Sequence, residues 1–250
     1  MSVMEYIPFL DSLIDLFTTQ QKSFQKFAHL LWLARYPILK GIGTTLAIST
    51  LSIVFGTILG IGVGLALTYG RRLVRWPVRI YTDFIRGTPV LVLILASFYI
   101  LDFVGLSLTA FQAGIFALTV FCSSHVGETV RGALQTIPKG QAEASTALGL
   151  TFFQTFRKVL WPQALRQMLP NWVNTAAEMV KASTLLSIIG VAELLLRTQE
   201  IISRTFMSLP FYFLAGFIYF SINFAIELFG KYVERKTAIA THANSTDRAS

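Results

Sequence analysis

The chain has 250 residues, of which 54% are hydrophobic and only 14% are charged, and its formal net charge is +8. A soluble domain usually carries about 25% charged residues, so the composition favours an all-α membrane protein. The basic residues form no soluble basic face, which argues against nucleic-acid binding. The single cysteine, Cys122, excludes an intrachain disulfide framework and a cysteine metal site, and we expect no bound metal.

Residues 1–36 form an N-terminal extracytoplasmic or interfacial segment. Their start has acidic residues in place of a basic n-region, and no small-residue cleavage site follows a clean apolar core, so no signal peptide is expected. Apolar residues at helical spacing suggest an amphipathic helix on the membrane surface, although a poorly ordered terminus fits equally well. These apolar residues are Ile7, Leu10, Ile14 and Phe17.

Residues 37–230 form the membrane domain, because several apolar runs approach or exceed the roughly 20 residues of a spanning helix. They predict about five transmembrane helices, at residues 42–66, 90–104, 106–126, 182–196 and 211–228. The fourth run is short, and it needs the preceding turns from about Trp172 to cross the membrane. Residues 231–250 follow as a polar tail.

The distribution of basic residues predicts the orientation. Lysines and arginines gather after the first span, between the third and fourth, and after the fifth, which places these segments and the C-terminus in the cytoplasm. Five spans then put the N-terminus outside. Four basic residues before the first span oppose this assignment, namely Lys22, Lys26, Arg35 and Lys40.

Three glycines, Gly56, Gly60 and Gly64, repeat every four residues in the first span. Small residues at this spacing let a second helix approach closely in a membrane. We therefore expect them to form a packed helix face. Such a face is structural and says nothing about cargo.

A polar segment, residues 138–170, separates the third and fourth spans and should contain two short helices. Thr136 is expected to cap the first, with Pro138 in its first turn and Gly149 at its end. The bend at Gly149 predicts an L-shaped pair.

The second helix should begin at a capping box of Thr151 and Gln154, and Pro162 should interrupt it. Small side chains leave a flat surface around Glu143, an acid suited to pair with a basic residue of a partner. A cytoplasmic loop with a solvated Glu143 explains the spacing as well. The small residues are Ala142, Ala144, Ser145 and Ala147.

Polar residues within the spans mark either internal ion pairs or a pathway. Glu128 with Arg131, and Glu178 with Lys181, stand three residues apart and are expected to pair within their helices. His125 must find a partner or line a cavity. Candidates for the substrate pathway are Ser123, Ser124, His125, Glu128 and Ser187, although the serines can instead bond to backbone carbonyls.

The polar segment resembles the E-A-A…G…L-P coupling loop of ABC importer permeases. Glu143-Ala144-Ser145 stands for E-A-A, Gly149 for the glycine, and Leu169-Pro170 for the closing pair. The resemblance implies the fold of a type I importer transmembrane domain, with an L-shaped coupling-helix pair. Its ATPase-coupling residues would be Gly140, Ala142, Glu143, Ala144, Ser145 and Gly149.

Further motifs resemble the histidine/glutamine type of polar amino acid importer permease, over residues 41–230. They are Arg86-Gly87-Thr88-Pro89, Glu128-x-x-Arg131-Gly132, Ile137-Pro138-Lys139-Gly140-Gln141, Trp161-Pro162-Gln163-Ala164 and Lys181-Ala182-Ser183-Thr184-Leu185. Ala182 replaces the usual acid after Lys181, and His125 stands where Tyr is common, so the cargo is left open. Arg86 could hold a cargo carboxylate or anchor the second span at the interface.

The chain has no G-x-x-x-x-G-K-[ST] phosphate loop, so we expect no cofactor on it. The resemblance implies a bacterial inner-membrane location, two separate ATPase subunits that hold ATP and magnesium, a second permease chain, an extracytoplasmic solute-binding protein and an amino acid substrate. A membrane-embedded enzyme is the rival, but His29, His125 and His242 are far apart in sequence. A proton-coupled secondary transporter would favour inverted repeats, which five spans do not provide.

Overall fold

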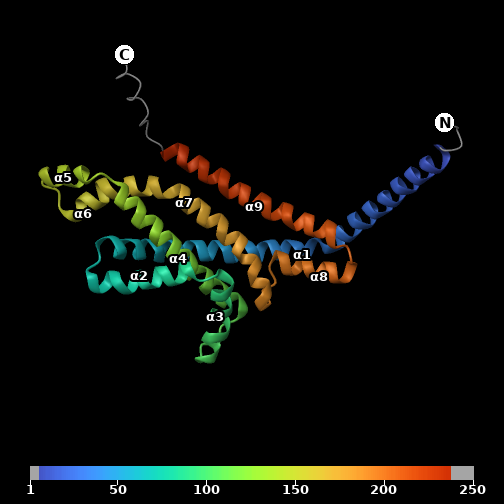
Figure 1. The fold of residues 1–250 in the computed structure, drawn as a ribbon, viewed down its shortest axis with the longest axis horizontal. Coiled ribbons are helices and arrows are strands. Elements are labelled where there is room, and N and C mark those ends of the chain that lie inside the picture. The colour runs from blue at the N-terminus through green and yellow to red at the C-terminus, as the bar shows by residue number, and fades with distance from the viewer. Residues whose placement is uncertain (1–5, 238–250) are drawn as a thin grey trace, which may run out of the picture.

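The computed structural model describes the backbone of residues 6–237 and the side chains of residues 25–236. Nearly all of this chain is helical (Figure 1). The side chains of the expected N-terminal amphipathic helix and residues 238–250 of the tail lie outside the described part. The elements are α1 (Tyr6–Tyr69), α2 (Arg72–Gly87), α3 (Val90–Phe103), α4 (Ala110–Thr136), α5 (Lys139–Ala147), α6 (Phe152–Thr155), the π-helix Phe156–Leu160, α7 (Trp161–Ala182), the 3-10 helix Ser183–Ile189, α8 (Leu194–Thr205) and α9 (Ser208–Thr237).

The prediction of about five spans is confirmed. Within the described residues, three helical stretches are long and apolar enough to cross a membrane, Gln25–Tyr69, Ala110–Thr136 and Ser208–Lys236. Two bent helix pairs supply two more spans if each pair counts as one. Helix α1 runs unbroken through residue 36, so no change of backbone structure marks the boundary placed there.

Helices α1 and α4 form the centre of the fold, and glycines set their distance. A Cβ atom added to Gly56, Gly60 or Gly64 would lie 2.5–2.6 Å from the Cβ atom of Cys122, Val126 or Val130, respectively. Real Cβ atoms do not approach so closely, so only glycine allows this contact. The expected close helix face in the first span is therefore turned toward α4.

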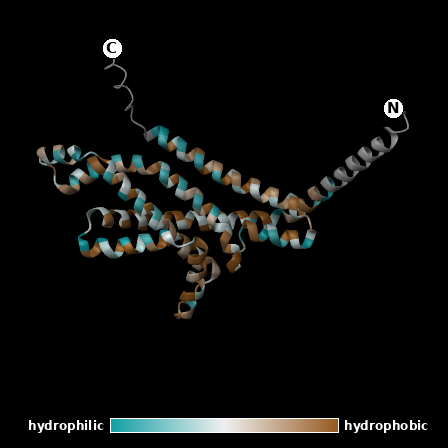
Figure 2. Cartoon of the chain, in the orientation of Figure 1, coloured by the Kyte–Doolittle hydropathy of each residue, from teal (hydrophilic) through white to brown (hydrophobic). Residues whose placement is uncertain are grey.

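The second span is bent, which the sequence did not lead us to expect. Helix α2 turns by 110° into α3 at Gly87-Thr88-Pro89. Thr88 has an extended backbone because it precedes a proline, and its hydroxyl donates to the carbonyl of Phe84 at 2.7 Å. Figure 2 shows α3 as mainly hydrophobic, whereas α2 alternates between polar and apolar residues.

The fourth span was expected at residues 182–196 together with the preceding turns from about Trp172, and the structure extends it at both ends and bends it. Helix α7 ends at Ala182 and is followed by a 3-10 helix. That 3-10 helix ends at Gly190, whose φ is +82°. The left-handed conformation at Gly190 ends the 3-10 helix, and Glu193 then caps α8. The span consists of residues Phe152–Ile189 followed by α8 at a bend of 51°.

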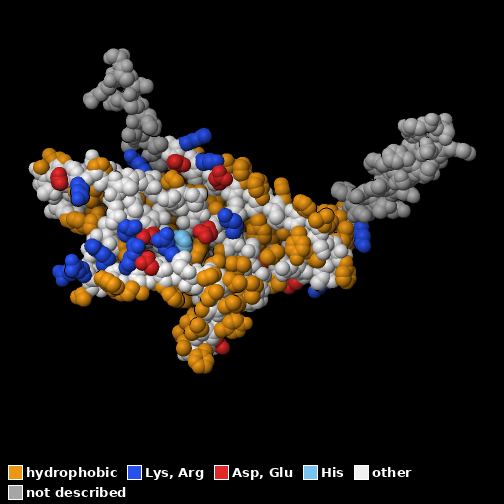
Figure 3. Space-filling model, viewed as in Figure 1, with side chains coloured by type: hydrophobic (Ala, Val, Ile, Leu, Met, Phe, Trp, Pro, Cys, Tyr) orange, Lys and Arg blue, Asp and Glu red, His pale blue; other side chains and the backbone are white. Residues whose placement is uncertain are grey.

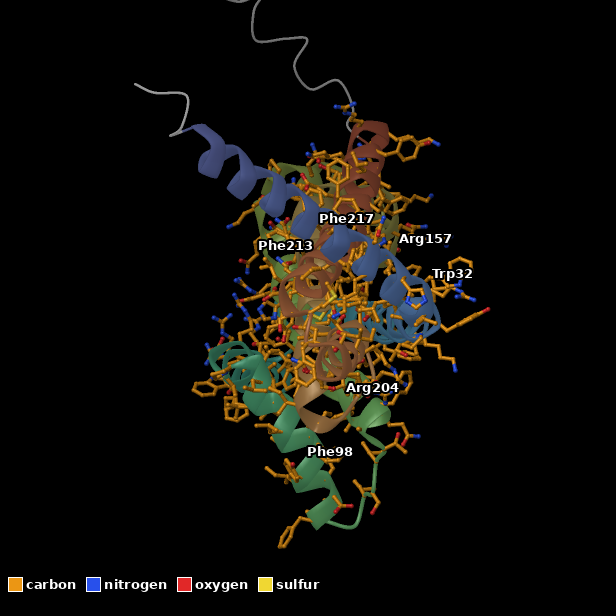
Figure 4. All side chains as sticks on the ribbon, turned by 90° about the vertical axis from the view of Figure 1, so that its right-hand side faces the viewer. Trp32, Phe98, Arg157, Arg204, Phe213 and Phe217 are labelled. Carbon is orange, nitrogen blue, oxygen red and sulfur yellow. The ribbon has the colours of Figure 1, made fainter. Side chains whose placement is uncertain are left out.

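A second apolar cluster joins α1, α8 and α9 at the opposite end of the molecule from α5 and α6 (Figure 1). The rings of Phe27 and Phe211 meet edge to face at 5.3 Å. Outside this cluster, Trp32, Phe213 and Phe217 are exposed on α1 and α9 (Figure 4). Large exposed aromatic side chains on these helices suit contact with lipid.

Candidate functional site

Helices α5 and α6 form the end of the molecule beyond α4 and α7 (Figure 1). The backbone turns at Gly149, where φ is +75°, in agreement with the expected bend. The amide of Leu150 donates to the carbonyl of Ser145 at 3.1 Å and closes the turn.

The expectation that Thr136 caps the first helix is wrong. Thr136 is the last residue of α4, and α5 begins after Pro138. The hydroxyl of Thr136 instead donates to the carbonyl of Ala133 at 2.9 Å and contacts the amide oxygen of Gln167 on α7.

The expected capping box at the start of the second helix is confirmed. The amide of Gln154 donates to the Thr151 hydroxyl at 3.4 Å, and the amide of Thr151 donates to the Gln154 side chain at 2.9 Å. Pro162 does not end the helix. A π-helical turn precedes it, and α7 continues from Trp161 with the proline in its first turn.

The outer surface of α5 and α6 carries one acid and three large apolar side chains. Glu143 is exposed and takes part in none of the ion pairs of the described residues. Leu148, Phe152 and Phe153 are 80%, 64% and 67% exposed. Exposed apolar side chains gathered at one end of a molecule are typical of an interaction surface, so this end is a candidate for one. We call these four residues the docking tip.

The other predicted coupling residues differ in how far their side chains are exposed. Gly140, Ala144 and Gly149 are exposed, and Ala142 is half-buried. Ser145 is buried and donates to the carbonyl of Gln141 at 2.7 Å, so its role lies within α5.

The docking tip is fastened to α1. The ring of Tyr69 meets the rings of Phe152 and Phe156 edge to face at 5.2 and 6.0 Å. Thr136 and Gln167 fasten α4 to α7 nearby. The tip thus contacts α1 directly, and α4 and α7 are joined to each other nearby.

Glu128 binds three arginines, not only the expected Arg131. Its carboxylate accepts from Arg79 at 2.9 Å and from Arg131, and the guanidinium of Arg86 lies 3.5 Å away. Asp83 pairs with Arg79 at 3.0 Å. We call these five residues the arginine cluster. The expected pair of Glu128 with Arg131 is confirmed, and the cluster also joins α2 to α4.

Sequence reasoning missed Arg79 and Asp83 because it considered ion pairs within one helix and did not identify residues 72–87 as a helix packed on α4. The signal was present, since Arg79 and Arg86 stand seven residues apart and so share a helix face. The position of Arg86 in the cluster fits its reading as an anchor of the second span.

We expect Glu128→Gln to destabilise the protein by about 2 kcal/mol, because three guanidinium groups lose their shared carboxylate, which is only 12% exposed. The free energy of unfolding, measured by SDS titration in mixed micelles, checks this. Asp83→Asn is the control, because Asp83 is 54% exposed and its pair should contribute less than about 1 kcal/mol. Equal losses in both variants would contradict a central role for Glu128.

The predicted pathway residues do not share one environment. Ser123 and Ser124 are buried and donate to the carbonyls of Val120 and Phe121 at 2.8 Å, the backbone bonding that we left open as an alternative. Ser123 also contacts the hydroxyl of Tyr81 at 2.6 Å and so joins α2 to α4. Ser187 is half-buried and donates to the carbonyl of Thr184.

His125 is half-buried and has local partners. Its Nδ1 lies 3.0 Å from the carbonyl oxygen of Phe121 and 3.3 Å from the Ser124 hydroxyl, and its ring lies 4.3 Å from that of Phe121. His125 and Ser187 are thus the pathway candidates whose side chains are partly exposed. Ser123 and Ser124 are buried, and the carboxylate of Glu128 is paired with arginines.

One face of α7 and α9 is polar although both helices belong to spans. Glu178 and Lys181 are exposed, and no ion pair joins them among the described residues, contrary to our expectation. Lys181 lines a hollow of about 460 Å³ together with Asn174, Asn223 and Glu227, among others. Figure 3 shows acidic, basic and histidine side chains across the middle of the visible face. Charges in a span require cover by protein or water, so this polar face is a candidate for the pathway.

Comparison with known proteins adds a family and relatives. Residues 52–239 match the family described as binding-protein-dependent transport system inner membrane component. The probable amino-acid ABC transporter permease protein YckA of Bacillus subtilis is 34% identical over 80% of this chain and 89% of the relative. The glutamine transport system permease protein GlnP of Escherichia coli is 32% identical over 83% of this chain and 98% of the relative.

Solved structures agree with the fold. The crystal structure of an amino acid ABC transporter with histidines superposes with a TM-score of 0.76 at 30% identity, covering 83% of this chain and 98% of that chain. The MetNI methionine ABC transporter in an inward-facing conformation has a TM-score of 0.71 at 24% identity, which supports the fold alone.

These matches extend over most of the membrane domain. The expected type I importer fold is confirmed, and the chain is a transport subunit rather than an enzyme, with ATP hydrolysed by separate subunits. The chain belongs to the family of binding-protein-dependent transport system inner membrane components, the permease subunits of ABC importers.

Proposed function

We propose that this permease imports an amino acid and that its docking tip transmits the force of a separate ATPase dimer. The names of its relatives, which include permeases for glutamine, arginine and cystine, support an amino acid as cargo. The observation that carries the coupling role is the docking tip, in which an exposed acid that forms no ion pair with any described residue shares one end of the molecule with three exposed apolar side chains.

The transport cycle requires that each nucleotide state hold the ATPases differently. When two ATPases close on ATP and magnesium, the two docking tips approach each other. The tip contacts α1 through Phe152 and Tyr69, and Thr136 and Gln167 join α4 to α7 nearby, so displacement of the tip tilts these spans together. The polar face of α7 and α9 then opens alternately to each side of the membrane.

A second permease chain faces this polar face, and the pathway lies between the two. Glu178 and Lys181 would otherwise stand in lipid, which is costly for charged groups. The zwitterion of an amino acid suits a lining that offers both signs of charge. The binding protein delivers it from outside, where the N-terminus lies, while α5, α6 and the C-terminus lie in the cytoplasm.

We expect Glu143→Lys to weaken binding of the ATPase about thirtyfold, the effect of losing about 2 kcal/mol when one partner of an interfacial charge pair is removed. The measurement is the affinity of the ATPase for the permease in nanodiscs, together with ATPase stimulation by the amino-acid-loaded binding protein. Phe153→Asp should have a similar effect, because it places a charge on the apolar part of the tip.

The matched control is Glu200→Lys, the same charge reversal on α8 at the opposite end of the molecule. It should leave ATPase affinity unchanged. If Glu143→Lys also leaves affinity and stimulation unchanged, the docking tip is not the coupling surface. Glu143→Lys could lose affinity for the ATPase as expected while no amino acid stimulates ATP hydrolysis by the wild-type complex. In that case only the assignment of an amino acid as cargo fails.

A further inference from the structure

An apolar groove lies between α1, α7 and α9, on the side of α7 away from its charged residues. Helices α1 and α9 meet near α8 and then diverge, with α7 between them (Figure 1). The groove has a volume of about 710 Å³, within the range of about 300–1,000 Å³ that is usual for ligand sites. Its lining includes Leu46 and Ile58 from α1, Trp172 and Val180 from α7, and Ile222 and Phe229 from α9.

The groove has the length of one lipid chain. The α1 residues that line it, from Leu46 to Ile58, rise about 18 Å along the helix axis. The hydrocarbon core of one leaflet is about 15 Å deep, half of the whole core. All three lining helices belong to spans, so the groove lies at the depth of the acyl chains.

The polarity of α7 and α9 indicates which side faces lipid. Asn174, Lys181, Asn223 and Glu227 line the hollow on one side of this helix pair. Trp172, among the groove residues on the other side, turns its indole N–H to the hydroxyl of Thr57 at 2.8 Å and leaves the ring to the groove. A second chain is needed to cover the polar side, whereas the apolar side is stable in lipid.

The groove face of α9 continues toward the cytoplasm into a tyrosine and a lysine. Tyr232 and Lys236 follow Phe229 at three and seven residues, so they stand on the same helix face. The ammonium of Lys236 lies 5.8 Å from the centre of the Tyr232 ring, and Lys236 is about 10 Å beyond Phe229 along the helix. Tyrosine favours the membrane interface, and basic residues there attract anionic lipid headgroups.

We propose that this groove is a binding site for an anionic phospholipid, with one acyl chain between α1 and α9 and the phosphate at Lys236. The assignment to the cytoplasmic leaflet rests on the orientation proposed above. The lipid fills the wedge between two helices that diverge from each other, and so stabilises the angle between them.

Native mass spectrometry of the permease purified with its ATPase, in micelles that contain phosphatidylglycerol and phosphatidylcholine, tests this site. Ile226→Trp fills the groove and should abolish the tightly held phosphatidylglycerol. Leu228→Trp is the matched control, because Leu228 is 51% exposed on the same helix and lies outside the groove lining. It should keep the lipid.

A second pair of variants tests the headgroup without altering the groove. Lys236→Gln should weaken retention of phosphatidylglycerol about fivefold, the loss expected for one lysine near an anionic headgroup, and leave phosphatidylcholine unchanged. Arg235→Gln removes the same charge from another face of α9 and should have less effect. Equal lipid retention in wild type and Ile226→Trp would overturn the proposal. Loss of the permease dimer in Ile226→Trp with lipid retention unchanged would also overturn it, because the groove would then be occupied by a second copy of the chain. Neither result depends on ATPase coupling, which Glu143→Lys tests separately.

Discussion

Gly60→Leu is expected to destabilise the permease by about 3 kcal/mol, the upper part of the range for overpacking in a well-packed core. A Cβ at this position would lie 2.6 Å from the Cβ of Val126 and 2.9 Å from the carbonyl oxygen of Ser123. Both atoms belong to the α4 backbone or its first side-chain carbon, so no rotamer change can make room. Helix α1 must move away from α4, and the contacts of Gly56 and Gly64 loosen with it.

The measurement is the free energy of unfolding in mixed micelles, with yield from the membrane as a second readout. Gly62→Leu is the control, because Gly62 lies in the same helix two residues away and an added Cβ meets nothing within 4 Å. A leucine there would lie on the exposed surface of the chain and should be tolerated. Similar destabilisation in both variants would show that glycine flexibility, and not the approach of α4, explains the effect.

The periodicity of the sequence was sufficient to predict the number of spans and the α1 face that meets α4. Apolar runs and glycine spacing are local features, and the membrane leaves few alternatives to a helix for each run. The turn at Gly149 and the capping box at Thr151 were predictable for the same reason, because both depend on residues within one turn of each other.

The bends within spans could not be read from hydropathy. Residues 72–87 are too polar to count as a span, so the 110° turn from α2 into α3 remained hidden although Pro89 marked its place. The fourth apolar run continues across Gly190, but the backbone there is left-handed and the helix ends. Hydropathy indicates which residues can be buried, but it does not indicate where the helix axis changes direction within a buried segment.

The site was predictable in its parts and not in its contacts. Sequence spacing suggested a pair of Glu128 with Arg131 because both lie on one helix, whereas Arg79 and Arg86 reach the same carboxylate from α2. The prediction of the docking tip was limited in the same way. Glu143 stood out as a single acid, but the exposure of Phe152 and Phe153 depends on how α6 folds back after Gly149.

Glu193 holds three helices together at the end of the molecule opposite the docking tip. Its side chain is completely buried and accepts from the amides of Leu195 and Leu196 at 2.9 and 2.8 Å, which caps α8. The hydroxyl of Tyr219 on α9 donates to the same carboxylate. Thr45 on α1 accepts from the amide of Leu194 at 3.2 Å. These bonds lie where α1 and α9 begin to diverge.

Glu193→Ala is therefore expected to cost about 3 kcal/mol, from a lost N-cap and from buried donors left without an acceptor. Tyr219→Phe removes one donor and should cost about 1 kcal/mol. Unfolding in mixed micelles gives both values. Glu200→Ala is the control, because Glu200 is 42% exposed and forms an ion pair only with Arg197 among the described residues.

The double variant separates a shared network from two independent contacts. If Glu193 and Tyr219 act together, the combined loss should fall short of the sum of the single losses by about 1 kcal/mol, since the tyrosine hydroxyl has little left to lose once its acceptor is gone. Strict additivity would mean that Glu193 only caps α8. In the expected case, the same carboxylate that starts α8 also fixes where α9 leaves α1, and the width of the groove between them depends on it.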